Sequence, residues 1–128
     1  MYKVIFACVH NAGRSQMAKA FFSSLAPSDY QGVSAGTEPA SKVHPEVLEV
    51  MQEIGIDLSA AKPTLLTIEL VESASLLVTM GCGEKCPFVP GLKIMDWKLE
   101  DPKGKDLDHV RKIRDQIKAE VLNLIKTL

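Results

Sequence analysis

Apolar runs alternate with amphipathic segments along the chain, a pattern typical of a parallel sheet with helices packed on both faces. The apolar runs predict strands at residues 3–7, 32–36, 75–80 and 92–95. Helical periodicity predicts helices at residues 14–25, 45–54, 67–72 and 106–126. The order of these elements predicts an α/β fold, a flavodoxin-like open four-stranded parallel sheet with strand order 2-1-3-4. No linker, repeat or low-complexity tract divides residues 1–128, so we expect a single domain.

Three of the predicted helices carry apolar side chains on one stripe, which predicts the face that each helix buries. The stripes consist of Met17, Ala18, Phe21, Phe22 and Leu25, of Val47, Leu48, Met51 and Ile54, and of Val110, Ile113, Ile117, Val121, Leu124 and Ile125. Pro27 and Gly55 are expected to end the first and second of these helices.

Size and composition narrow the classes of function. A chain of 128 residues with 46% hydrophobic content supports one packed core. Three cysteines cannot all pair, and no signal sequence precedes the first strand, so we expect free thiols in the cytoplasm. No segment approaches the roughly 18 apolar residues of a membrane span. The formal net charge of -1, with no basic stripe, favours small molecules or proteins as partners over nucleic acid or lipid, and we expect a monomer.

The segment between the first strand and the first helix joins a cysteine to an arginine through five residues. It consists of Cys8, Val9, His10, Asn11, Ala12, Gly13 and Arg14, followed by Ser15. Such a loop can curl around a tetrahedral anion, with backbone N–H groups inward and a helix N-terminus behind them. The same field stabilises a thiolate, so Cys8 is a candidate nucleophile, and Arg14 can grip two anion oxygens. A buried core cysteine beside a solvated arginine is the alternative, but the order of small residues and helix start favours the anion loop.

Together with other segments, this loop resembles the low-molecular-weight protein tyrosine phosphatase superfamily, and within it the arsenate reductases, over nearly the whole chain. The other segments are Ser34-Ala35-Gly36, Val78-Thr79-Met80, Cys86-Pro87 and Trp97-Lys98-Leu99-Glu100-Asp101-Pro102-Lys103-Gly104. Gln16 follows Arg-Ser, as in the reductases, where the phosphatases usually carry proline. Lys103 and Gly104 stand where the phosphatases tend to place aromatic residues. The resemblance implies reduction of arsenate to arsenite; a phosphomonoesterase and a non-catalytic oxyanion-binding module are the alternatives.

The predicted chemistry begins with attack of Cys8 on the bound oxyanion, which gives a covalent intermediate. Arg14 and the loop amides neutralise the charge that develops. Ser15 can donate a hydrogen bond to the sulfur of Cys8, or serve as the helix N-cap, and both roles can coexist. Asp101, stiffened by Pro102, is the candidate general acid on the strength of the resemblance, with Glu100 as the second candidate. Composition alone would favour a solvated charged turn there.

Arsenate reduction needs two electrons, and the chain carries no flavin or nicotinamide fingerprint, so we expect no bound cofactor and a thiol as the reductant. In one scheme Cys82 attacks Cys8 in the arseno-adduct, and Cys86 or an external reductant such as thioredoxin opens the disulfide. In the other, glutathione or mycothiol attacks the adduct and a glutaredoxin-type protein resolves the mixed disulfide. Cys82 is the better redox candidate, because it lies between Gly81 and Gly83, and Cys86 can alternatively pack as a small hydrophobic residue. A second cluster of ligands is lacking, so we expect no zinc site.

Several other polar residues receive secondary assignments. Asn11 is expected to maintain the geometry of the loop, whereas His10 either contacts the anion or faces solvent. His44 is interpreted as a helix-start residue, and His109 is expected on the exposed side of the last helix, outside the site. Lys19 replaces an acidic residue that binds potassium in the family, which argues against a bound potassium ion.

Overall fold

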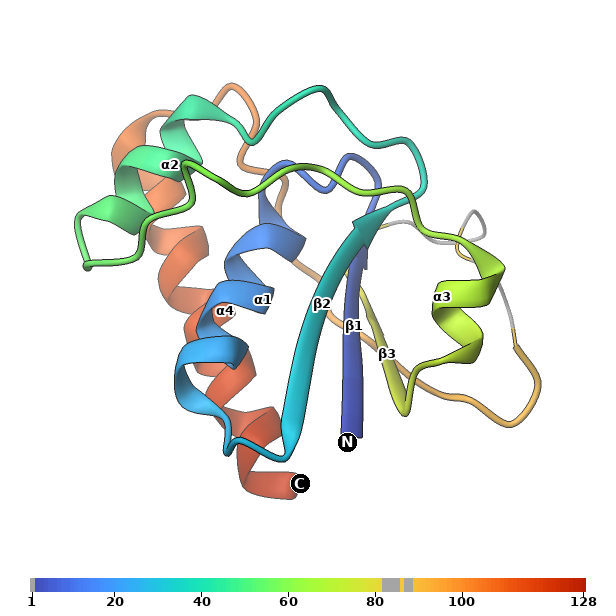
Figure 1. Cartoon of the computed structure of the whole chain (residues 1–128). Coiled ribbons are helices and arrows are strands. Elements are labelled where there is room, and N and C mark those ends of the chain that lie inside the picture. Colours follow the sequence, from blue (N-terminus) through green and yellow to red (C-terminus); the bar gives the residue numbers. More distant parts are fainter. Residues whose placement is uncertain (1, 82–85, 87–88) are drawn as a thin grey trace.

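A four-stranded parallel sheet lies at the centre of the computed structural model, which describes residues 2–81, 86 and 89–128 (Figure 1). The strands are β1 (Tyr2–Cys8), β2 (Tyr30–Gly36), β3 (Leu76–Thr79) and β4 (Lys93–Asp96). Their order across the sheet is β2-β1-β3-β4, and each neighbouring pair is parallel. The predicted fold class and strand order are therefore confirmed, and the last strand lies at the edge as expected.

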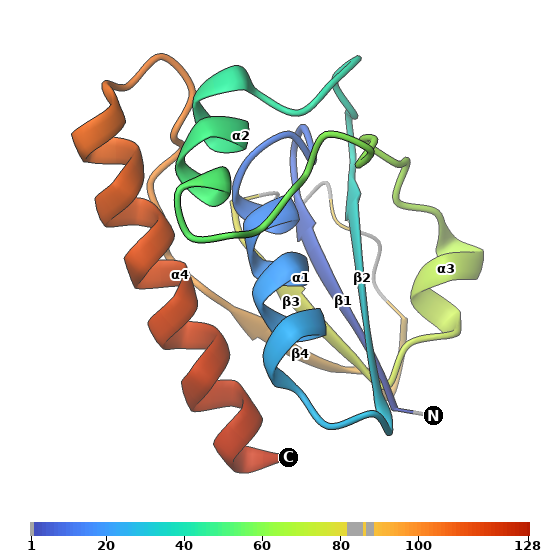
Figure 2. The same cartoon turned by 60° about the vertical axis from the view of Figure 1, so that its left-hand side comes forward.

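Helices cover both faces of this sheet. The helices α1 (Arg14–Leu25), α2 (Pro45–Gln52) and α4 (Leu107–Thr127) lie on one face, and the short α3 (Ile68–Glu72) lies on the other (Figures 1 and 2). Side chains along β1 alternate between the two faces, as in any strand. Phe6 and Cys8 join the larger core under α1 and α4, whereas Ile5 and Ala7 join the smaller core under α3. In the described part of the chain, none of the helices has the length and apolar character to cross a bilayer.

Two predicted boundaries were wrong by two residues, the end of the second helix and the start of the second strand. α2 ends at Gln52, so Ile54 lies beyond the helix and is 42% exposed. α1 ends at Leu25 as predicted, but Leu25 is 42% exposed and does not belong to the buried face of the helix. Hydrophobic periodicity sets the phase of a helix but not the residue at which the chain turns away, which explains the error at α2. β2 begins at Tyr30, earlier than predicted, because an edge strand tolerates polar residues such as Gln31.

The carboxyl ends of the strands meet at one edge of the sheet, opposite the end where both chain termini lie (Figure 1). β1 continues one residue beyond its predicted end, to Cys8, which pairs with Gly36 at the end of β2. β3 ends at Thr79, beside Asp96 at the end of β4. Loops that follow all the strands therefore meet at the edge where ligands bind in open α/β sheets.

Candidate active site

Every carbonyl oxygen of the loop between β1 and α1 accepts a hydrogen bond. The carbonyls of residues 8–13 are bonded at donor–acceptor distances of 2.8 to 3.3 Å. The donors are the backbone N–H groups of Thr37, Glu38, Ala40, His44 and Met17 and the side-chain amide of Gln16. Within the residues that the structure describes, the backbone N–H groups of residues 9–13 donate no hydrogen bond. The loop, which we name the oxyanion loop (residues 8–14), therefore keeps its N–H donors for an anion.

A chain of side-chain hydrogen bonds leads from a neighbouring loop to the sulfur of Cys8. The backbone N–H of Thr64 donates to Oδ1 of Asn11 at 2.9 Å, which orients the amide so that Nδ2 donates to Oγ of Ser15 at 2.7 Å. Oγ of Ser15 lies 2.8 Å from Sγ of Cys8. Because a thiolate can only accept, Ser15 donates its proton to the sulfur when Cys8 is ionised. Cys8 is only 2% exposed, and hydrogen bonds to a charged acceptor are strong in such surroundings.

Asn11 holds the curvature of the oxyanion loop. Its φ of 51° lies in the left-handed region, which asparagine tolerates better than most residues. The side-chain amide of Gln16 donates to both the carbonyl and Oδ1 of Asn11, at 3.1 and 3.2 Å. The sequence assigned Asn11 to loop geometry, and the structure gives it partners outside the loop's own backbone, Thr64 and Ser15. Replacing its side chain would therefore disturb the loop and the hydroxyl group that faces Cys8.

The N-terminus of α1 has no side-chain cap. Gly13 occupies the N-cap position, and no side-chain hydrogen bond caps the helix. The alternative that Ser15 is the N-cap was therefore wrong, since Ser15 lies inside the first turn and bonds to Cys8 instead. The N–H groups of the first helical turn carry partial positive charge, which adds to the field of the oxyanion loop.

The guanidinium group of Arg14 is held from two sides. Its Nη1 donates to the carbonyl of Leu99 at 3.2 Å, and the side chain is only 11% exposed. Gly81, just after β3, packs so closely that a Cβ there would lie 2.7 Å from Nη1. Gly81 also has a φ of +95°, which residues other than glycine rarely adopt. The position of this guanidinium therefore depends on a glycine that the sequence did not single out.

We expect Gly81→Ala to weaken oxyanion binding about tenfold, because the new methyl group displaces the guanidinium of Arg14. Gly91→Ala is a matched control, since Gly91 has a similar φ of +84° and nothing within 4 Å of its added Cβ. Backbone strain should lower the free energy of unfolding of both variants by a similar amount, about 1–3 kcal/mol. Phosphate titration by calorimetry and thermal unfolding separate the two effects. Equal affinity in both variants would show that Gly81 does not position Arg14.

Asp101 lies beside the oxyanion loop, as predicted for a general acid. Its Oδ2 is 3.8 Å from Nη2 of Arg14, and its side chain is 47% exposed. Oδ1 accepts a hydrogen bond from the backbone N–H of Lys103 at 3.0 Å. The next residue, Pro102, packs on the loop, because a Cβ added at Gly13 would lie 2.8 Å from its Cγ. Two consecutive residues thus connect the segment after β4 to the loop that carries Cys8.

Glu100, the second candidate for the acid, points to a different element. Its Oε2 lies 2.9 Å from Nε2 of His109 and 3.5 Å from Nζ of Lys105. The hydrogen bond with His109, assisted by Lys105, holds the pKa of Glu100 below its ordinary value. A general acid must carry a proton when substrate binds, so this carboxylate suits the role poorly. The geometry therefore favours Asp101.

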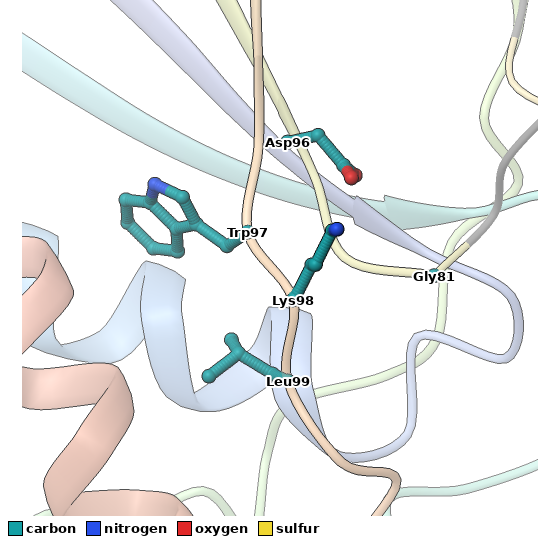
Figure 3. Close-up of a pocket in the computed structure, with 5 residues that line it drawn as sticks. All are labelled: Gly81, Asp96, Trp97, Lys98 and Leu99. Atoms are coloured by element: carbon teal, nitrogen blue, oxygen red, sulfur yellow. The ribbon is translucent and has the colours of Figure 1, made fainter.

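A cavity of about 370 Å³ opens beside Arg14. It is lined by Gly81 and by the segment from Asp96 to Leu99, the residue whose carbonyl accepts from Arg14. The side chains of Asp96 and Lys98 point toward the side of Gly81, whereas those of Trp97 and Leu99 point the other way (Figure 3). The cavity is larger than a tetrahedral anion needs, so a second reactant has room to approach there.

The remaining predicted site residues are Cys82, Cys86 and His10. Cys82 lies outside the described residues. Cys86 is half-buried beside the smaller core under α3 and is disulfide-bonded, so the expectation of free thiols was wrong for Cys86, and packing as a small hydrophobic residue does not describe it fully. His10 turns away from the loop's interior, since Nδ1 donates to the carbonyl of Glu38 at 3.0 Å. The bond lies at the surface and His10 is only half-buried, which agrees with the solvent-facing alternative and gives no support to a contact with the anion.

Two further assignments have a structural outcome. His44 is the N-cap of α2, as its sequence context predicted. Lys19 lines a hollow of about 240 Å³ together with Lys62 and Thr64, the residue whose N–H binds Asn11. Two ammonium groups disfavour a cation such as potassium in this hollow.

The sequence interpretation missed the contacts of three residues at the site, Gln16, Thr64 and Gly81. Gln16 was noted as part of the Arg-Ser motif, but its hydrogen bonds to Asn11 were not expected. Thr64 and Gly81 act from distant segments, and no local pattern marks them. His109 lies on the exposed side of α4, as expected.

This chain is similar to known proteins over nearly its full length. The model of the family described as low molecular weight phosphotyrosine protein phosphatase matches residues 3–128. A putative arsenate reductase of Halobacterium salinarum is 40% identical over 124 residues, which are 93% of this chain and 87% of that protein. A glutaredoxin arsenate reductase of Synechocystis sp. is 37% identical over 128 residues, 98% of this chain and 97% of that protein.

A solved structure gives a similar picture. A thioredoxin-dependent arsenate reductase of Corynebacterium glutamicum superposes with a TM-score of 0.86 at 41% sequence identity. The match covers 99% of this chain but 61% of that protein, which is therefore considerably longer.

Proposed function

Because this chain belongs to the low-molecular-weight phosphotyrosine protein phosphatase family, we propose that it is an arsenate reductase in which Cys8 is the nucleophile. The observation that carries the proposal is the oxyanion loop. The carbonyl groups of residues 8–13 all accept hydrogen bonds, which leaves the N–H groups of the loop for an anion. Cys8 begins the loop, and Oγ of Ser15 lies 2.8 Å from its sulfur. The relatives named above, which are arsenate reductases, support arsenate as the substrate.

In the first step, the thiolate of Cys8 attacks the arsenic atom of arsenate held in the loop. A sulfur–arsenic bond forms, the bond from arsenic to a hydroxyl group of the arsenate breaks, and this hydroxyl takes a proton from Asp101 and leaves as water. Arg14 and the loop N–H groups stabilise the charge on the remaining oxygens. Ser15 stabilises the thiolate before the attack.

In the second step, a second thiolate attacks the sulfur of Cys8. A sulfur–sulfur bond forms, the sulfur–arsenic bond breaks, and its electron pair stays on arsenic, which leaves as arsenite. The two electrons come from the two sulfur atoms, so an external thiol must then reduce the disulfide. We propose Cys82 as the second thiol and thioredoxin as the reductant, with glutathione or mycothiol and a glutaredoxin-type protein as the other scheme. Either scheme requires a reducing compartment, and we place the protein in the cytoplasm.

Cys82→Ser tests the internal scheme. Arsenate reduction should collapse, or come to depend on a small thiol, because no internal thiolate resolves the adduct. Hydrolysis of an aryl phosphate should survive, since water rather than a thiol resolves the covalent adduct in that reaction. Cys86→Ser is the matched comparison: a similar collapse would mean that Cys86 opens the disulfide, and normal reduction would mean that it only packs. Unchanged reduction in Cys82→Ser with thioredoxin alone would refute the role of Cys82.

The activity itself is tested by arsenate-dependent oxidation of NADPH. Thioredoxin with its reductase, glutaredoxin with glutathione, and mycothiol with its own recycling system are supplied separately. The proposal predicts turnover with at least one system and stoichiometric arsenite. A phosphomonoesterase is the competing function, because the matched family is named for it. Hydrolysis of aryl phosphates without arsenite formation in any of the three systems would establish that competitor instead.

A further inference from the structure

The segment that carries Asp101 depends on a few contacts for its position. Residues 97–106 form neither helix nor strand, and the side chains of Glu100 and Asp101 are about half exposed, at 48% and 47%. Burial therefore holds neither carboxylate. The segment is held by the buried side chain of Trp97, by the bond from Arg14 to the carbonyl of Leu99 and by the packing of Pro102 on the oxyanion loop. Asp101 adds its contacts with Arg14 and the backbone N–H of Lys103, and Glu100 adds those with His109 and Lys105.

The two consecutive carboxylates are directed to different elements. Glu100 reaches His109, in the first turn of α4, and Lys105, whereas Asp101 reaches Arg14, at the start of α1. Because the two side chains share one stretch of backbone, holding Glu100 against α4 restricts the directions in which Asp101 can point. The backbone of His109 is fixed in the first turn of α4, since its N–H donates to the N-cap carboxylate of Asp106 at 2.8 Å.

We propose that Glu100 is a positioning residue, which His109 and Lys105 hold so that Asp101 presents its carboxyl group to the oxyanion loop. This inference rests on the proposed function. It gives a role to Glu100, which the sequence made the second candidate acid, and to His109, which the sequence placed outside the site. The lowered pKa of Glu100 is consistent with it, because a carboxylate that stays ionised keeps its partners. Glu100 acts through Asp101 and does not touch the substrate.

The test measures kcat and KM for arsenate, at saturating thiol donor, in four variants. Glu100→Gln and His109→Ala should each lower kcat about tenfold and change KM less than about twofold, because the acid is misplaced while the anion site is intact. His109→Gln should recover most of the activity, since its amide can donate to Glu100. Asp108→Asn is the matched control. It removes a 2.6 Å ion pair with Arg111 in the same turn of α4, and its activity should stay unchanged.

A second measurement separates positioning from a general loss of structure. Glu100→Gln is repeated in an Asp101→Asn background, where it should cost no further activity, because the residue that it positions is gone. Thermal unfolding should be nearly unchanged, since exposed ion pairs add little stability. A normal kcat in Glu100→Gln, or the same loss with and without Asp101, would overturn the inference while the wild-type protein still reduces arsenate. A wild-type protein that forms no arsenite would overturn the proposed function as well.

Discussion

Replacing Cys8 by serine is expected to abolish arsenate reduction, with a loss of about 10⁴-fold or more. A serine hydroxyl is not ionised near neutral pH and cannot form the disulfide that carries the electrons away. The N–H groups of the oxyanion loop belong to the backbone and remain in place, so phosphate should still bind. Arsenite formation measured over hours, together with calorimetric titration of phosphate, checks both parts.

The same experiment can refute the assignment of the nucleophile. Measurable, thiol-dependent arsenite formation by Cys8→Ser would mean that another thiol attacks arsenate. Loss of phosphate binding along with activity would mean that the substitution had damaged the loop, and Cys8→Ala would then be compared.

Replacing Arg14 by lysine is expected to lower kcat/KM for arsenate about 10²- to 10³-fold, although the charge is kept. A lysine ammonium cannot bind two oxygens of the anion in the fork geometry of a guanidinium. It also lacks the geometry with which Nη1 reaches the carbonyl of Leu99 while Nη2 faces Asp101. Steady-state kinetics with arsenate, and the dissociation constant of phosphate, measure the loss.

Arg111→Lys is the matched control for that substitution. Arg111 lies on α4 and pairs with Glu53 and Asp108, far from the oxyanion loop in the chain and without contacts to it among the described residues. Its kinetics should be those of the wild-type protein. A kcat/KM within about threefold of wild type in Arg14→Lys would show that charge alone suffices and that the fork of Arg14 is dispensable.

Phosphatase and reductase chemistry share the steps up to the covalent adduct. In the proposed mechanism Cys8, Arg14 and Asp101 would serve both reactions, because each begins with attack on a tetrahedral oxyanion and departure of a protonated oxygen. The two activities separate at the next step, where water or a thiol resolves the adduct. The cavity lined by Gly81 and residues 96–99 lies next to Arg14, since Gly81 packs on its guanidinium and the carbonyl of Leu99 accepts from it, so a second reactant could approach from that side.

Most of the fold and the centre of the site were predictable because their determinants are local. The alternation of apolar runs and amphipathic segments is enough for the sheet order and for the helices on its faces. The oxyanion loop is contiguous in sequence, so Cys8, Arg14 and Ser15 could be assigned before any distance was known. Helix ends were less predictable, as Ile54 shows, since the periodic pattern continues after the backbone has turned.

The surroundings of the site depend on contacts between distant segments. Thr64 binds Asn11 across 53 positions of the sequence, and nothing in either local pattern indicates the pairing. Gly81 matters only because Arg14 packs against it. The choice between Glu100 and Asp101 likewise depends on which element each side chain meets, and two adjacent acids look alike in a sequence.

The account depends above all on a reactive thiolate at Cys8 inside an anion-binding loop. The most direct test is alkylation of the reduced protein with iodoacetamide at neutral pH, followed by peptide mass spectrometry, with and without phosphate or arsenate. We predict rapid labelling of Cys8 and strong protection by either anion but not by chloride at equal ionic strength. A Cys8 that stays unlabelled under these conditions, or is labelled at the same rate with and without the anions, would contradict it.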